Sequence, residues 1–265
     1  MAKSARIVIY SLKKSFQDII LSPFLFLVLF FTEALFIIIF SSIFTKYAPL
    51  ILSSLRDITS NLQQLVQAGD LGIAYSTMLI NFAVFVLLSY LAYMLVNGVN
   101  WELTYFMAFR EINYLRYLRK FIVVALIFTL PLFALLSLAA DLLFRINTLF
   151  GVIFIWIIVL SSFYFMYISF GLINPDVFGF RDFVKHIKKT FKFGKENLFV
   201  MLLSYFFISI IYLLLVALIY IFVESNILLL TAFLAAFVLF INISRLFLIN
   251  LVNNIEGKFD KIGLK

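Results

Sequence analysis

The sequence predicts an all-α, polytopic membrane protein with six transmembrane helices and amphipathic helices at the cytoplasmic membrane interface. Of its 265 residues, 65% are hydrophobic and 13% are charged, about half the charged fraction of a soluble domain. Six long apolar runs follow one another, and the basic residues gather on one side of them. Because the runs are continuous rather than alternating, they predict helices and not the strands of a membrane barrel.

Each run is long enough to cross a hydrocarbon core of about 30 Å at about 1.5 Å per residue. The runs are Pro23–Phe44, Ile73–Val96, Phe121–Phe144, Leu149–Ile173, Leu198–Phe222 and Ile227–Asn250. The basic start of the chain resembles a secretory signal, but the first run exceeds the usual apolar segment of about 7 to 15 residues. We therefore expect an uncleaved first span.

The basic residues predict the orientation, because loops rich in Lys and Arg stay on the cytoplasmic side during insertion. Four precede the first run, four follow the second, six follow the fourth and four lie near or after the end of the sixth, which makes 18 of 21. The opposite side has Lys46, Arg56 and Arg145. We expect a cell-membrane protein with both termini in the cytoplasm. The net charge of +8 then comes from a basic cytoplasmic side that would interact with lipid rather than with nucleic acid.

An internal repeat organises the spans. Residues 12–16 (LKKSF) align with residues 187–191 (IKKTF) at an offset of 175, and each copy is a basic amphipathic stretch that leads into two spans. We predict a single membrane domain over residues 1–265, built from a first unit (1–98), a degenerate second unit (99–173) and a third unit (174–265). Every hairpin would enter from the cytoplasmic side, so the repeats would be parallel.

The clearest amphipathic stretch precedes the fifth run. Its apolar residues recur at helical spacing on one face, and its lysines recur on another; these lysines are Lys185, Lys188, Lys189 and Lys192. Such a helix lies flat, with each ammonium group worth about 1 kcal/mol near an anionic leaflet. We predict that these four, with Lys13 and Lys14 of the first copy, bind anionic lipid. The alternative is that the helix only anchors its loop, because positive charge also serves topology.

The same region resembles a known family. Residues 175–177 (PDV), the amphipathic stretch, and residues 194–197 (GKEN) at the entry to a span resemble poorly characterised six-helix membrane proteins. These include the membrane domain attached to some bacterial glycerophosphodiester phosphodiesterases. The resemblance covers residues 174–203 in sequence and the remainder in topology only. It implies the six-helix fold, and it implies no activity because this sequence has no phosphodiesterase domain.

Glu33 is the one carboxylate deep inside a predicted span, about ten residues or about 15 Å from its inner end. A charge at that depth costs several kcal/mol unless it is paired or neutral, so Glu33 is a functional candidate. Asn242 and Arg245, three residues apart, face one side of the sixth span, and Arg245 could extend its head group toward Glu33. Three interpretations of Glu33 remain open. It is a structural hydrogen-bonding group, or it relays a proton or cation, or the span boundary is misplaced and Glu33 lies nearer the membrane interface.

The sequence gives little support to catalysis. It has no cysteine, which excludes thiolate nucleophiles and cysteine-based metal sites, and it has no phosphate-binding glycine loop or acyl-transfer elbow. The single histidine, His186, is expected to be a solvated loop residue. We therefore expect no enzyme, no cofactor and no metal site. Convergence of Asp176, Asp182 and His186 on one pocket would instead favour an enzyme that acts on lipid.

Two functional hypotheses remain. The first is a non-enzymatic membrane protein that engages anionic lipid through its basic helices, for membrane organisation or as a subunit of a complex. The second is a small transporter or permease component in which Glu33 couples to a proton or cation. The expected partners are membrane lipids, with a further membrane protein or a second copy of the chain as alternatives, and no nucleic acid.

Overall fold

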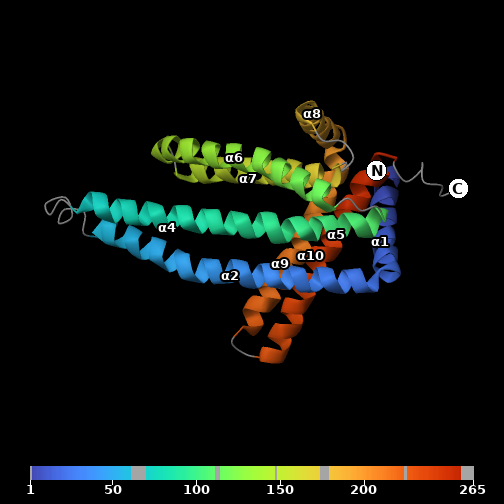
Figure 1. Cartoon of the computed structure of the whole chain (residues 1–265), viewed down its shortest axis with the longest axis horizontal. Helices are drawn as coiled ribbons and strands as arrows, with labels where there is room; N and C mark the ends of the chain where they lie inside the picture. Colours follow the sequence, from blue (N-terminus) through green and yellow to red (C-terminus); the bar gives the residue numbers. More distant parts are fainter. Residues whose placement is uncertain are drawn as a thin grey trace. The chain divides into compact units, whose positions relative to one another are not determined.

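The computed structural model describes residues 2–60, 70–110, 114–146, 148–173, 179–223 and 226–257, and their side chains except at 2–4, 71, 114, 133–146, 148–150, 152 and 180. All regular elements within these ranges are helices (Figure 1). They are α1 (Ala2–Leu21), α2 (Pro23–Ser60), α4 (Leu71–Ala92), the π-helix η1 (Tyr93–Asn97), α5 (Gly98–Phe109), α6 (Tyr114–Ile146), α7 (Thr148–Gly171), α8 (Phe180–Glu196), α9 (Leu198–Phe222) and α10 (Ile227–Ile255).

Among the described residues, five helical segments are long and apolar enough to cross a membrane. They are Pro23–Ser60, Gly72–Phe109, Ile153–Gly171, Leu198–Phe222 and Ile227–Ile255. The prediction of an all-helical, membrane-embedded chain is thereby confirmed. The remaining predicted span, Phe121–Phe144, falls within α6, and its second half has side chains outside the described set, so this span stays a prediction.

The first two membrane segments are longer than the sequence predicts. Each has 38 residues, or about 57 Å at about 1.5 Å per residue, nearly twice the thickness of a hydrocarbon core. The first continues past the predicted end at Phe44 with Pro49 inside the helix, and the second continues past Val96 through η1 into α5. A run of apolar residues therefore located these helices but did not locate their ends.

The chain divides into two units, residues 31–98 and residues 1–30 with 99–265, and each is described by itself. In the first of these, α2 and α4 with η1 form an antiparallel hairpin. Phe36 packs edge-to-face against Tyr93 at 6.4 Å between ring centroids, and Phe44 packs edge-to-face against Phe85 at 6.2 Å. From Phe36 to Phe44 the chain advances eight residues along α2, while the contacted residue moves back eight, from Tyr93 to Phe85. This order shows that the two helices run antiparallel. Glu33, also in this unit, is only 2% exposed.

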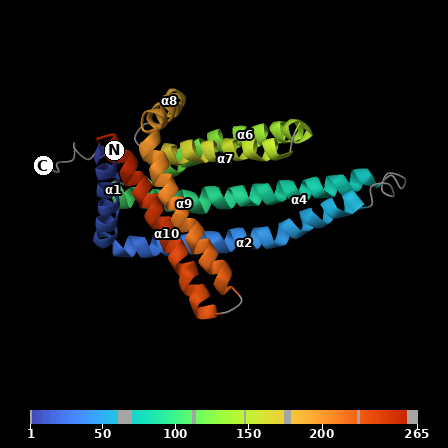
Figure 2. The same ribbon diagram turned by 180° about the vertical axis from the view of Figure 1, so that it is seen from behind.

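The larger unit is held together by aromatic packing. Within it α6 packs on α7, α9 packs on α10, and α10 packs on both α7 and α1, an arrangement visible in Figures 1 and 2. Trp101 of α5 is 1% exposed and lies 5.0 Å from Phe170 of α7, whose ring lies 4.4 Å from Phe121 of α6. The guanidinium of Arg245 stands 5.5 Å from the Trp101 ring, a cation–π geometry. These residues fix α5, α6, α7 and α10 together.

The N-terminal helix α1 packs its polar side against α10. Ser15 and Asp18 are buried, and the side-chain amide of Asn250 donates to both, at 3.0 Å to Ser15 Oγ and 2.9 Å to Asp18 Oδ2. One turn away, Asn254 Nδ2 donates to Ser11 Oγ at 2.7 Å. Buried polar groups need such partners, so the α1–α10 contact depends on register as well as on packing.

Asp18 makes this contact sensitive to pH. Burial raises the pKa of its carboxyl group above the usual 3.8, against the opposing effects of the Asn250 hydrogen bond and of the Lys14 and Arg110 charges. The folded chain therefore holds the proton more tightly than the unfolded chain, and stability falls as pH rises from the ordinary carboxyl value through the raised one. We expect Asp18→Asn to flatten that part of the profile, so that the variant's advantage in melting temperature grows between pH 4 and neutrality. A constant difference across this range would contradict the assignment.

Candidate functional site: a basic cavity beside α8

Helix α8 carries most of the predicted lipid-binding residues and is seated on α7 by its C-terminal half. The hydroxyl of Tyr164 donates to the carbonyl of Gly194 at 2.8 Å. A Cβ at Gly194 would lie 2.8 Å from Cε1 of Phe165, so the absence of a side chain permits this close approach. Thr190 and Phe193 are also buried. The lysines project away from this seat, and Lys185, Lys188, Lys189 and Lys192 are all exposed.

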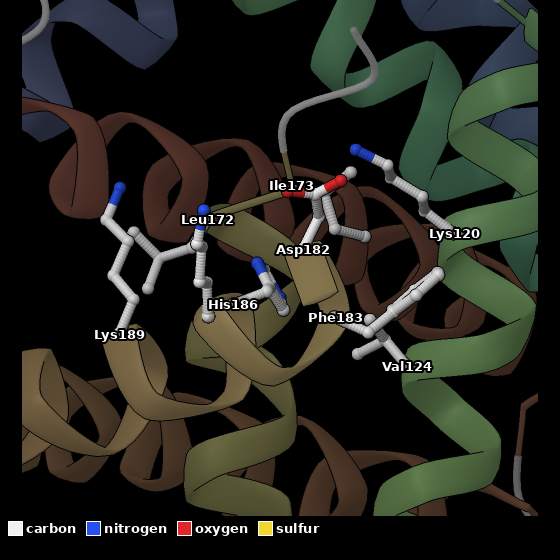
Figure 3. A pocket seen from close by; sticks show the side chains of 9 residues that line it. Lys120, Val124, Leu172, Ile173, Asp182, Phe183, His186 and Lys189 are labelled. Carbon is white, nitrogen blue, oxygen red and sulfur yellow. The ribbon is translucent and has the colours of Figure 1, made fainter. Parts of the chain in front are cut away.

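A cavity of about 190 Å³ opens between the first half of α8 and its neighbours. Its walls come from α6, from the C-terminal end of α7 and from α8 (Figure 3). The lining residues are Lys120, Val124, Leu172, Ile173, Asp182, Phe183, Lys185, His186 and Lys189. In Figure 3, His186 lies between Lys189 on one side and Asp182 with Lys120 on the other.

Two contacts hold His186 and Lys189 in place at the cavity. The His186 Nε2 atom is hydrogen-bonded to Ser169 Oγ at 2.7 Å, and Ser169 is completely buried in α7. The Lys189 ammonium forms a salt bridge with Glu256, just after the end of α10. The histidine that sequence reasoning expected to be a solvated loop residue is instead half-buried and fixed against α7, because Ser169 lies opposite it across the helix contact.

The charges favour an anion. Three lysines, one imidazole and one carboxylate, Asp182, line the cavity. A second carboxylate, Glu256, pairs with one of the lysines, Lys189, so the basic groups outnumber the acidic ones. Lysine ammonium groups bind phosphate as compact charges, and basic pockets between membrane helices on the cytoplasmic side are typical head-group sites.

The cavity contains part of the residue set that the enzyme alternative requires. Ser169, the hydroxyl nearest His186, is 0% exposed and beyond the reach of a substrate. Asp182 and His186 do line one cavity, but Asp176 lies outside the described residues. No group of three or more acidic or imidazole side chains suited to a metal occurs in the part of the chain that the structure describes.

The other predicted site residues lie elsewhere. Lys13 is exposed on α1, whereas Lys14 is half-buried, and burial lowers the pKa of its ammonium while Asp18 partly opposes that shift. Arg245 Nη1 donates to Asn242 Oδ1 at 3.2 Å, so these two lie on one side of α10. Glu33 is not among the residues that line the cavity beside α8.

Sequence reasoning missed Lys120 and Glu102. Lys120 is one of the four basic residues that follow the second predicted span, yet it is 8% exposed and lines the cavity. Glu102 lies between the second and third predicted spans, yet it is 7% exposed in α5, and its Oε1 atom has no hydrogen-bond partner within the described ranges. Their only signal was proximity to the aromatic residues Trp101 and Tyr117, which indicates a buried environment rather than a loop.

Comparison with protein families, with curated proteins and with solved structures finds no match. The class of protein therefore follows from the fold itself. The chain is an all-helical, membrane-embedded protein with several apolar helices long enough to span a bilayer. A basic cavity lies beside one of its short polar helices.

Proposed function

We propose that this protein is a non-enzymatic, multi-pass protein of the cell membrane that engages anionic lipid head groups through its basic helices, serving membrane organisation or a larger complex. The observation that carries the proposal is the surface of α8. Its exposed lysines stand beside the exposed apolar side chains Val184 and Phe191. A helix with this surface is stable where acyl chains meet head groups.

Helix α1 supports the same function. Ile9, Leu12, Phe16 and Ile20 are exposed along one line of the helix, and Lys13 is exposed beside them. Because the polar side of α1 is buried against α10, its outward apolar line is suited to lipid and not to the protein core. Two basic helices would then contact the cytoplasmic leaflet.

The finer architecture is part of the proposal: six spans, with α6 as the remaining one, in parallel repeats. Two helix junctions support the repeat. The break between α1 and α2 falls at Ser22, and the break between α8 and α9 falls at Asn197, which are 175 residues apart, the offset at which the sequence aligns with itself. The resemblance to the membrane domains of glycerophosphodiester phosphodiesterases is proposed at this level of topology only, with both termini cytoplasmic.

Neutralising the α8 lysines tests the lipid function. We expect the fourfold change of Lys185, Lys188, Lys189 and Lys192 to Gln to lower the preference for anionic lipid at least about tenfold, because each charge near an anionic leaflet is worth about 1 kcal/mol. The measurement is the association constant of spin-labelled phosphatidylglycerol relative to phosphatidylcholine in reconstituted bilayers. The difference should shrink in high salt, since exposed charges are screened.

The matched control replaces the same residues with Arg, which keeps the four charges. Arg variants should retain the wild-type preference, and circular dichroism should show equal helix content in all three proteins. An unchanged preference for anionic lipid in the Gln variant would reject the proposal.

A further inference from the structure

The cavity beside α8 distinguishes two sets of lysines that the sequence presents as equivalent. Lys185 and Lys189 line the cavity, whereas Lys188 and Lys192 do not. All four are exposed on one helix. If they only attract an anionic leaflet, each should contribute about equally to lipid binding. A ligand inside the cavity would contact only the first pair.

The cationic end of the cavity is built around Lys185, His186 and Lys189. The imidazole is oriented by Ser169, and Asp182 lies on the far side of His186 from Lys189 in Figure 3. Phe183 and Leu172 supply apolar wall beside these charges. Ammonium and imidazole groups that line a cavity beside apolar surface suit a phosphate attached to a larger, partly apolar molecule, because charge-assisted hydrogen bonds to phosphate are strong.

Glu256 pairs with one of the lysines at this end of the cavity. Its carboxylate forms a salt bridge with Lys189, and its side chain is 10% exposed. A phosphate placed between Lys185 and Lys189 would compete with this carboxylate for the Lys189 ammonium. Removing the charge of Glu256 should therefore strengthen the binding of an anion in the cavity.

We propose that the cavity between α6, α7 and α8 is a specific site for a phosphate group, held by Lys185, His186 and Lys189 and carried on the head group of an anionic lipid. The inference rests on the proposed lipid function and deepens it, because it replaces diffuse attraction by one site with a defined occupant. A monoester phosphate, as in phosphatidic acid, carries more charge than a diester. The site should therefore prefer phosphatidic acid to phosphatidylglycerol.

The test compares two double variants of the full-length protein in neutral detergent micelles. Lys185→Gln with Lys189→Gln removes two cavity charges, and Lys188→Gln with Lys192→Gln removes two charges from the same helix outside the cavity. Native mass spectrometry measures the dissociation constant of phosphatidic acid for each. We expect the first variant to bind about tenfold more weakly and the second to stay within about twofold of the wild type. Lys185→Gln against Lys188→Gln repeats the comparison with the Lys189–Glu256 salt bridge intact.

Glu256→Gln provides a result of opposite sign that damage to the fold cannot imitate. We expect it to tighten the binding of phosphatidic acid about two- to fivefold, while Lys185→Gln with Lys189→Gln abolishes that gain. Inorganic phosphate in the same micelles separates the possible sources. Failure of phosphate to displace the lipid supports a head-group site, whereas displacement at equal concentration would assign the site to a soluble phosphate compound and overturn the lipid assignment.

The outcomes separate this inference from the function on which it rests. Equal weakening by the two double variants would overturn the cavity site and leave diffuse lipid attraction standing. No weakening in either variant would overturn both. Weaker binding in Glu256→Gln would also contradict the site, because it would place that carboxylate among the groups that support the ligand.

Discussion

Replacing Trp101 by alanine is expected to lower the free energy of unfolding by about 3–5 kcal/mol, the usual cost of removing a large buried aromatic side chain. Trp101 is 1% exposed and contacts the rings of Phe170 and Tyr167 at 5.0 and 5.8 Å between centroids. It also lies under the guanidinium of Arg245. Alanine would leave a cavity where α5, α7 and α10 meet. Chemical unfolding in mixed micelles, followed by circular dichroism, measures the loss.

Trp156 provides the matched control, since it is the chain's other tryptophan and is 60% exposed. Trp156→Ala removes the same side chain from a position facing outward from α7, so stability should change by less than about 1 kcal/mol. Fluorescence distinguishes the two, because a quencher carried on lipid acyl chains should reach the single tryptophan left in Trp101→Phe far better than the buried one left in Trp156→Phe. Equal losses in the two alanine variants would contradict the packing described here.

The membrane class and the position of most spans were predictable because hydropathy acts over a whole segment. About twenty apolar residues in succession leave few structures other than a spanning helix. The ends of the helices were not predictable, because polar residues such as Glu102 can continue a helix when they are buried inside protein. The predicted end at Val96 was wrong, because the helix continues without a break from η1 into α5.

The candidate site was only partly predictable for a related reason. Periodicity along α8 predicted that the four lysines share a side of that helix, and all four are exposed. It could not show which neighbour covers the helix. Lys120 comes from α6 and Glu256 follows α10, so their approach to α8 depends on tertiary packing between segments that are far apart in the sequence.

Replacing Asn250 by leucine should cost about 2–4 kcal/mol, although leucine is more apolar and nearly isosteric. The Asn250 amide is the donor shared by Ser15 and Asp18, and Asp18 is 7% exposed. A buried hydrogen bond to a charged group contributes about 1.5–3 kcal/mol, and leaving the acceptor unpaired adds its desolvation cost. Helix α1 should then loosen from α10. Hydrogen exchange in α1, together with the melting temperature, measures the effect.

Asn253→Leu is the control, because Asn253 is equally buried on the same helix but donates only to the Ile249 carbonyl of its own helix. Its Oδ1 atom lacks a partner within the described part of the chain, so leucine there should be neutral or stabilising. Adding Asp18→Asn to Asn250→Leu should recover part of the lost stability, since the unpaired group then carries no charge. Purely additive effects would show that Asn250 and Asp18 do not interact, and α1 would then depend on apolar packing alone.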